Sequence, residues 1–239
     1  MVQKPDPNTS REAGCFAVTY ERKYYRQGNV FIKRSLRPSE FQTGYRGLHI
    51  PRLGKERLMN EAACLRFIRQ NTNIPVPAVF CDFEDANAYY LIMEYVDGVS
   101  MADLQEEKKM KVKNEIEAHL VTLAQLKSTR VGGLSGIVIP PYRVTLETDI
   151  DTWILPESGT DDYVFCHNDL SQENVIVDPC TLKINAIIDW EYAGFFPPFF
   201  ERPFYTRLGP SVAVGEETTD TVQLLDFLIS HQVDRTVEV

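Results

Sequence analysis

One polar segment of this chain combines side chains that can move protons and hold a cation. Residues 167–174 read His-Asn-Asp-Leu-Ser-Gln-Glu-Asn, and Asp189 follows after two apolar runs. A carboxylate such as Asp169 can orient and deprotonate a hydroxyl, while Asn174 and Asp189 supply oxygen ligands that Mg²⁺ accepts together with phosphates. Phosphoryl transfer from a nucleoside triphosphate needs this set and little covalent chemistry from the protein. The spacing therefore predicts a phosphoryl-transfer site, with His167 beside it.

The elements around this loop should bring its ends together. Apolar, β-prone runs lie at residues 163–166 and 175–177, and a third lies at 182–188 after an Asp-Pro turn. The last two runs predict a hairpin that would bring Asn174 and Asp189 to one cation. Taken singly, each of these polar residues could instead cap a turn or end a strand in solvent. The combination favours the chemical interpretation.

Length and charge limit the classes of function. At 239 residues and 27.4 kDa, the chain can form one large domain or two small lobes. A net charge of −9 with a pI near 5.0 argues against sequence-independent nucleic-acid binding and would suit a cationic small-molecule partner. No apolar run approaches the length of a membrane span, so no membrane association is expected.

The cysteines indicate a reducing compartment. The 5 cysteines include no C-x-x-C pair, and Cys64, Cys81 and Cys166 lie in apolar runs that predict buried, reduced thiols. The 4 histidines offer no zinc spacing. Residues 1–12 are polar with two prolines and match neither a signal peptide nor a transit peptide. We therefore expect a frayed tail at residues 1–12 and a cytosolic, cytoplasmic location.

The first part of the chain predicts a small sheet with one helix. Residues 16–25 and 30–33 are β-prone on either side of a Gln-Gly-Asn turn, which indicates a hairpin that ends at Lys33. Residues 56–70 predict an amphipathic helix that places Glu61 within its apolar stripe. A carboxylate in that position is costly unless it is paired. Lys33 is the nearest candidate partner.

The remaining elements complete the pattern. Residues 35–55 predict a loop with one short helical turn, and residues 79–83 and 89–94 predict two strands. A long helix is expected at 114–127, preceded by a charged run at 106–113 that we interpret as solvated surface. Strands thus dominate the first part of the chain and helices the second, which predicts an α+β fold with two lobes.

The ordered residues resemble the protein-kinase-like superfamily, and specifically its aminoglycoside/choline phosphotransferase branch, including fungal members. In that branch the metal-binding segment reads Ile-Asp-Trp-Glu, as at residues 188–191 here, where other kinases have Asp-Phe-Gly. The resemblance covers roughly residues 20–205. It implies an N-lobe at 13–95 with a small antiparallel sheet that binds nucleotide, and a mainly helical C-lobe at 96–239 with the catalytic hairpin and the acceptor site.

The resemblance implies how the N-lobe binds ATP. Lys33 would contact the α- and β-phosphates and pair with Glu61. The backbone of the connector between the lobes, at Glu94, Tyr95 and Val96, would receive the adenine.

The resemblance also implies roles in the C-lobe. Asp169 would be the catalytic base, and His167 would brace its loop. Asn174 and Asp189 would hold Mg²⁺ on the phosphates of ATP. The acceptor would be a hydroxyl of a small molecule.

Two departures from the family pattern bear on activity. The segment before Lys33 contains only Gly14 and Gly28 and leaves almost no room for a first strand, so the phosphate-covering glycine loop is expected to be missing unless the turn at Gly28 replaces it. The family also places acceptor-binding helices after the metal-binding aspartate, where this chain has an aromatic loop at 195–200 and one helix at 219–230. We expect that loop to be core packing rather than a pocket wall. The acceptor pocket would then be reduced, built partly from residues 35–55, or absent.

Three hypotheses follow. The leading one is an ATP-dependent small-molecule kinase. The alternative is a degenerate kinase fold that acts as a non-catalytic binding or regulatory module, which the missing glycine loop favours. Phosphorylation of a protein side chain is disfavoured because no activation segment ending in Ala-Pro-Glu follows Asp189.

Overall fold

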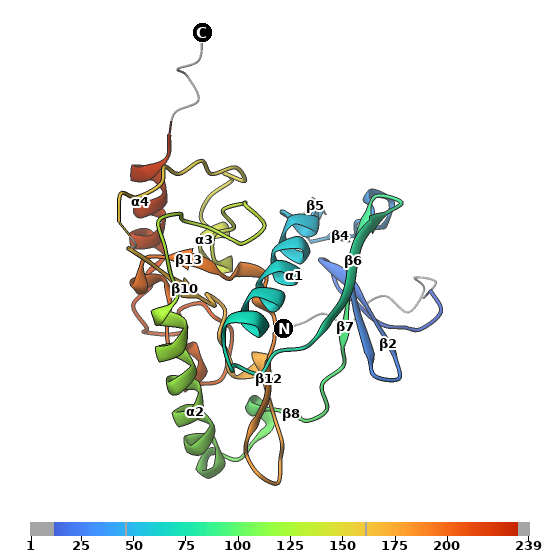
Figure 1. Cartoon of the computed structure of the whole chain (residues 1–239). Coiled ribbons are helices and arrows are strands. Elements are labelled where there is room, and N and C mark those ends of the chain that lie inside the picture. The colour runs from blue at the N-terminus through green and yellow to red at the C-terminus, as the bar shows by residue number, and fades with distance from the viewer. Residues whose placement is uncertain (1–11, 46, 161, 234–239) are drawn as a thin grey trace.

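The computed structural model describes residues 12–45, 47–160 and 162–233, and its N-terminal part is an antiparallel sheet (Figure 1). The sheet has five strands in the order β1-β2-β3-β7-β6. These strands are β1 (Cys15–Val18), β2 (Arg22–Gln27), β3 (Val30–Ser35), β6 (Val79–Asp85) and β7 (Ala88–Glu94). The predicted α+β fold with a small antiparallel N-terminal sheet is confirmed. The lobe boundary after residue 95 stays a prediction, and residues 1–11 of the expected tail lie outside the described residues.

The beginning of the sheet differs from the sequence-based expectation. Residues 16–25 do not form one strand, because Thr19 starts a turn in which its Oγ1 accepts hydrogen bonds from the amides of Glu21 and Arg22 at 3.2 and 3.1 Å. A first strand, β1, therefore exists and pairs with β2. The expectation that the chain has almost no room for a first strand was wrong. Gly28, in the left-handed region with φ of 59°, forms the next turn, between β2 and β3.

Helix α1 (Gly54–Asn71) lies between the sheet and the rest of the molecule (Figure 1). The predicted apolar face is buried, with Leu58, Leu65 and Ile68 at most 1% exposed. Glu61 lies on the same face and is fully buried, as its position in the stripe predicted. Before this helix, residues 35–53 contain one 3₁₀ turn and a two-stranded pair, β4 (Thr43–Gly44) and β5 (Gly47–Leu48).

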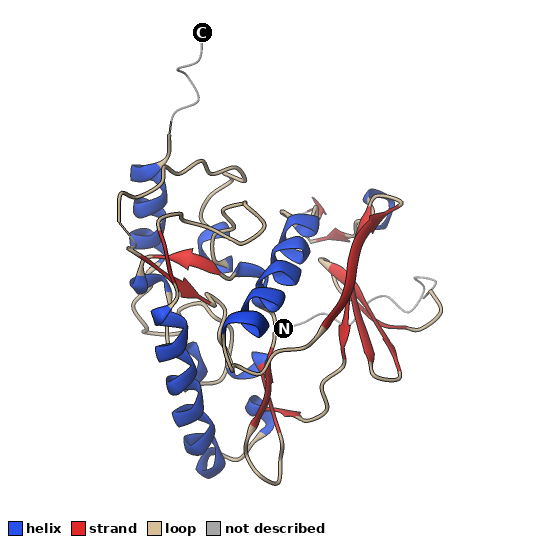
Figure 2. Ribbon diagram, viewed as in Figure 1, coloured by secondary structure: helices blue, strands red, loops and turns tan. Residues whose placement is uncertain are grey.

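The C-terminal part combines helices with two small sheets (Figure 2). One sheet has the order β13-β10-β9 and the other β12-β11-β8. Their strands are β8 (Val99–Ser100), β9 (Lys127–Ser128), β10 (Tyr163–Cys166), β11 (Val175–Val177), β12 (Ile184–Ile187) and β13 (Gly194–Phe196). The helices are α2 (Glu106–Gln125), α3 (Tyr142–Thr145) and α4 (Thr221–His231). The predicted hairpin after the polar loop is therefore present as β11 and β12.

Helix α2 begins eight residues before the predicted start at 114. The charged run at 106–113 is helical because acidic residues favour the first turn of a helix, and Glu106 accepts a hydrogen bond of 2.7 Å from Lys109. The aliphatic stem of Lys109 packs inward, so that residue is only 1% exposed. Most of the run is exposed, as expected of a solvated surface, but Lys109 and Val112 are buried.

The aromatic segment at residues 195–200, which begins in β13, belongs to the core, as expected. Phe196 and Phe200 are fully buried and stack with ring centroids 4.9 Å apart.

Cys64 and Cys166 are buried free thiols, whereas Cys81 is exposed on the edge strand β6, which corrects its predicted burial. In the part of the chain that the structure describes, no helix has the length and apolar character needed to cross a membrane.

Candidate phosphoryl-transfer site

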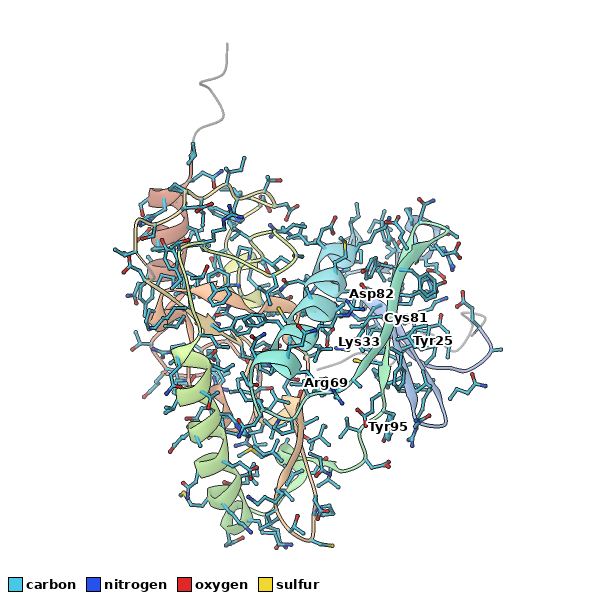
Figure 3. The ribbon with its side chains drawn as sticks, in the orientation of Figure 1. Tyr25, Lys33, Arg69, Cys81, Asp82 and Tyr95 are labelled. Carbon is cyan, nitrogen blue, oxygen red and sulfur yellow. The ribbon has the colours of Figure 1, made fainter. Side chains whose placement is uncertain are left out.

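A buried lysine connects three elements at the centre of the molecule. Lys33 on β3 places its Nζ 2.7 Å from Oε1 of Glu61 on α1, and both residues are at most 4% exposed. The same Nζ donates a hydrogen bond to Oδ1 of Asp189. Figure 3 shows Lys33 on the side of the sheet that faces α1. The predicted ion pair is thus present, and Asp189 joins it.

The charges of this centre depend on one another. Burial alone would lower the pKa of Lys33, but the carboxylates of Asp189 and Glu61 raise it. Burial opposes ionisation of Asp189 as well, yet Lys33 and Arg22 keep its pKa below the usual value. Burial raises the pKa of Glu61, and Lys33 only partly offsets that effect. The lysine therefore stays charged and holds Asp189 as a carboxylate.

His167 supports the loop from a fully buried position at the end of β10. Its Nε2 donates to the carbonyl of Ile188 at 3.0 Å, and its Nδ1 accepts from the amide of Asp169 at 3.3 Å. Its ring also packs against Trp190 with centroids 4.5 Å apart. Burial lowers the pKa of His167 to about 4, so the imidazole is neutral. These contacts suit the bracing role that the resemblance implied.

The hairpin brings Asn174 and Asp189 together through the backbone. The amide of Ile188 donates to the carbonyl of Asn174 at 2.9 Å, which places Asp189 directly after a residue bonded to Asn174. Asp189 has φ of 66° and ψ of 48°, a left-handed conformation that is uncommon for a residue with a side chain. The indole of Trp190 donates to Ile187 at 2.8 Å and anchors this bend. Such strained positions concentrate at functional sites.

Asp169 lies beside Asn174 on the polar loop. The side-chain amide of Asn174 donates through Nδ2 to the backbone carbonyl of Asp169 at 2.7 Å and to Oδ2 of the same residue at 3.3 Å. Burial raises the pKa of Asp169 to about 7, and the charge of Asp189 adds to that effect. Ser211 also lies against this carboxyl group, a neighbour that no sequence pattern indicated. A carboxyl group with a pKa near neutrality can exchange protons at physiological pH.

The donor atoms fit the predicted Mg²⁺ site. The side-chain amide oxygen of Asn174 accepts no hydrogen bond from the described residues, and the Asp189 side chain is 36% exposed. Nowhere in the described ranges do three or more histidine, cysteine or acidic side chains group as a metal site of their own. An amide oxygen and one carboxylate, completed by phosphate oxygens, is a set that Mg²⁺ accepts.

A cavity of about 280 Å³ opens beside Lys33 and Asp189. It is close to the lower size limit of small-molecule pockets, and its lining includes Tyr24, Phe31, Met93 and the whole predicted connector, Glu94, Tyr95 and Val96.

Two of the three connector residues already use their backbone amides within the protein. The amide of Glu94 donates to Ala78 at 2.8 Å, and that of Tyr95 donates to Asn29 at 2.7 Å. The amide of Val96 has no acceptor within the described part of the chain. If the connector receives an adenine, as the resemblance implies, Val96 is the connector residue whose backbone amide is left to donate to it.

A second cluster of charged side chains lies close to Lys33 and Asp189, and the sequence analysis did not predict it. Arg22 on β2, 3% exposed, forms an ion pair with Glu191. Arg57 on α1 lies 3.4 Å from Glu191, donates to the Tyr192 hydroxyl at 2.6 Å and contacts Glu21. The sequence held one signal: Arg22 is two residues from a β-prone tyrosine, so strand alternation places both on the same face.

A smaller cavity bears on the expected acceptor pocket. Its volume is about 150 Å³, and its lining includes His49, Arg52 and Leu53 from the segment 35–55 together with Tyr142 and Tyr192. The structure thus has a hollow where part of an acceptor pocket was expected, although that use of it stays a prediction.

Comparison with solved structures identifies the class of fold. A thermostable mutant of aminoglycoside phosphotransferase APH(4)-Ia, in ternary complex with ADP and hygromycin B, aligns with a TM-score of 0.52 and 16% identity over 78% of this chain and 68% of that chain. Aminoglycoside phosphotransferase APH(3'')-Id from Streptomyces rimosus aligns with a TM-score of 0.52 and 17% identity over 74% and 70% of the two chains. The fold is that of the kinase-like aminoglycoside phosphotransferases.

The family comparison adds evidence from the sequence. Residues 145–201, which include the polar loop and the hairpin, match the model of the phosphotransferase enzyme family. A search of curated proteins gave no match. The resemblance to the aminoglycoside phosphotransferase branch of the protein-kinase-like superfamily is therefore confirmed.

Proposed function

We propose that this protein is an ATP-dependent phosphotransferase that moves the γ-phosphate to a hydroxyl of a small molecule. One observation carries the proposal. A buried lysine held by Glu61 and Asp189 lies beside a cavity lined by the connector between the two parts of the molecule, and Asp169 lies on the loop that leads to Asn174.

Each part of the site has a task in this reaction. The Val96 amide would receive the adenine, and Lys33 would bind the α- and β-phosphates while Glu61 keeps the lysine in place. Asp169 would accept the proton of the acceptor hydroxyl while the hydroxyl oxygen attacks the γ-phosphorus. The bond from that phosphorus to the β-phosphate oxygen would break, and ADP would depart. Asn174 and Asp189 would hold Mg²⁺, which when bound neutralises charge that develops on the phosphates.

The electrostatics support Asp169 as the base. A carboxyl group with a pKa of about 7 is partly ionised at neutral pH and is a stronger base than an ordinary aspartate. His167, with its pKa lowered to about 4, cannot supply a charged acid at that pH, so we assign it to positioning of the loop. The acidic net charge of −9 supports a cationic acceptor, and the cytoplasm as location is part of the same proposal.

The test compares wild type with Asp169→Asn. Calorimetry should show that both bind Mg·ATP with similar affinity. Incubation with γ-labelled ATP and a metabolite extract should give a labelled small molecule with wild type, and Asp169→Asn should reduce its rate by about 10²–10⁴-fold. Asp178→Asn is the matched control, because Asp178 lies on the same hairpin and only caps its turn through the amides of Cys180 and Thr181.

Two results would count against the enzyme. Binding of Mg·ATP without any labelled product would favour the degenerate, non-catalytic alternative. Equal turnover by wild type and Asp169→Asn would remove Asp169 from the role of base.

A further inference from the structure

Arg22 is a buried cation on β2, close to the proposed nucleotide cavity although not part of its lining. In the register of β2 and β3, Arg22 pairs with Ser35 and Tyr24 pairs with Lys33. Side chains two residues apart on a strand share one face of the sheet, so Arg22 lies on the same face as Tyr24 and Lys33. Both of those residues line the cavity. Arg22 thus lies one step beyond Lys33, on the side away from the connector.

The adjoining turn has few backbone amides left for a phosphate: among the described residues, only the Tyr20 amide of this turn has no acceptor. The amides of Glu21 and Arg22 donate to Oγ1 of Thr19, and the Thr19 amide donates to the carbonyl of Arg22 at 2.9 Å. Three donors that face the start of β2 are therefore already used within the turn. A phosphate that extends past Lys33 needs most of its further donors from side chains.

The charges around Arg22 allow it to change partner. Its ion-pair partner Glu191 also lies 3.4 Å from Arg57, so that carboxylate keeps a cation if Arg22 leaves. A guanidinium in this place can donate two parallel hydrogen bonds to a phosphate.

We propose that Arg22 is a phosphate-binding residue that takes the place of the missing glycine loop, exchanging Glu191 for the terminal phosphates of the nucleotide. The inference rests on the proposed function, since it requires ATP in the cavity. It gives the nucleotide two cations from the sheet, Lys33 for the inner phosphates and Arg22 for the outer ones. Glu191 then competes with the nucleotide for Arg22.

Binding measurements on two variants with opposite expected effects test this proposal. Arg22→Gln should weaken the binding of ATP by about 10- to 100-fold, because hydrogen bonds from a charged group are lost. The affinity for AMP should be unchanged. Glu191→Gln should bind ATP more tightly than wild type, because Arg22 is no longer held by a carboxylate. Misfolding cannot produce that gain. Lys23→Gln is the matched control, since Lys23 is the next residue of β2, on the opposite face, and pairs with Glu40 at 2.7 Å.

The outcomes separate this inference from the proposed function. If wild type binds neither AMP nor ATP, the proposed function fails and the role of Arg22 fails with it. If wild type binds ATP, and folded Arg22→Gln binds it equally well, Arg22 is only a structural ion pair. Weaker ATP binding by Glu191→Gln would likewise overturn the exchange of partners.

Discussion

Replacement of Lys33 by methionine should destabilise the fold, and the loss should be larger above neutral pH than below it. Glu61 is fully buried, its Oε2 accepts no hydrogen bond, and Lys33 is its ion-pair partner in the described ranges. Removal of the lysine leaves an uncompensated carboxylate in the interior. Loss of one partner from a buried pair costs about 3–5 kcal/mol of the free energy of unfolding.

The pH dependence follows from the pKa of Glu61. Burial raises it to about 7 in the folded protein, compared with about 4.3 in an unfolded chain. A group with a raised folded pKa adds stability below its unfolded pKa, and that contribution disappears as the pH rises through the folded pKa. Without Lys33 the folded pKa of Glu61 rises further. The loss through Glu61 should therefore be negligible near pH 5, about 1.4 kcal/mol at pH 8 and about that much more for each further pH unit. Asp189 loses its lysine at every pH, which adds a loss that does not change between these pH values.

Urea unfolding of wild type and variants at these two pH values measures the effect. The double variant Lys33→Met with Glu61→Leu should recover the part of the loss that grows with pH, because it removes both charges of the Lys33–Glu61 pair. Glu61→Gln should cost less than Lys33→Met, since Lys33 keeps Asp189 as a partner. The reasoning is refuted if Lys33→Met loses the same free energy at both pH values, or if the double variant is no more stable than Lys33→Met.

Three further predictions concern the metal site, the base and the packing. Asp189→Asn keeps the shape but removes a ligand charge, so calorimetry should show weaker Mg·ATP binding; unchanged affinity would exclude Asp189 as a ligand. Because Asp169 must be ionised to act as a base, kcat/KM should rise with pH through its pKa of about 7 and then level off, and a flat profile there would contradict this role. Gly194→Ala would place a Cβ 2.4 Å from the carbonyl oxygen of Gly132 and should cost about 1–3 kcal/mol in thermal unfolding. Gly159→Ala meets no atom within 4 Å, so equal melting temperatures for the two variants would argue against the packing explanation.

Local sequence determined the parts of the site that lie within one turn or hairpin. The spacing from His167 to Asn174 and the apolar runs around it predicted a polar loop followed by a hairpin, because alternation and turn chemistry act over a few residues. Helical periodicity likewise placed Glu61 on the buried face of α1, where burial required a cation. Lys33 was identifiable as that cation because it was the nearest candidate on a neighbouring strand.

Tertiary structure decided the contacts between distant segments. Arg22 and Glu191 are 169 residues apart in the chain, and no local periodicity links them. The start of β2 depends on Thr19 binding two amides, a hydrogen-bond choice that β propensity does not record. Burial of the Lys109 stem depends on what packs against α2. Local patterns determine which face of an element is apolar. Ion pairs between distant segments, such as Arg22 with Glu191, are settled only when the elements pack, because an unpaired charge in the interior costs several kcal/mol.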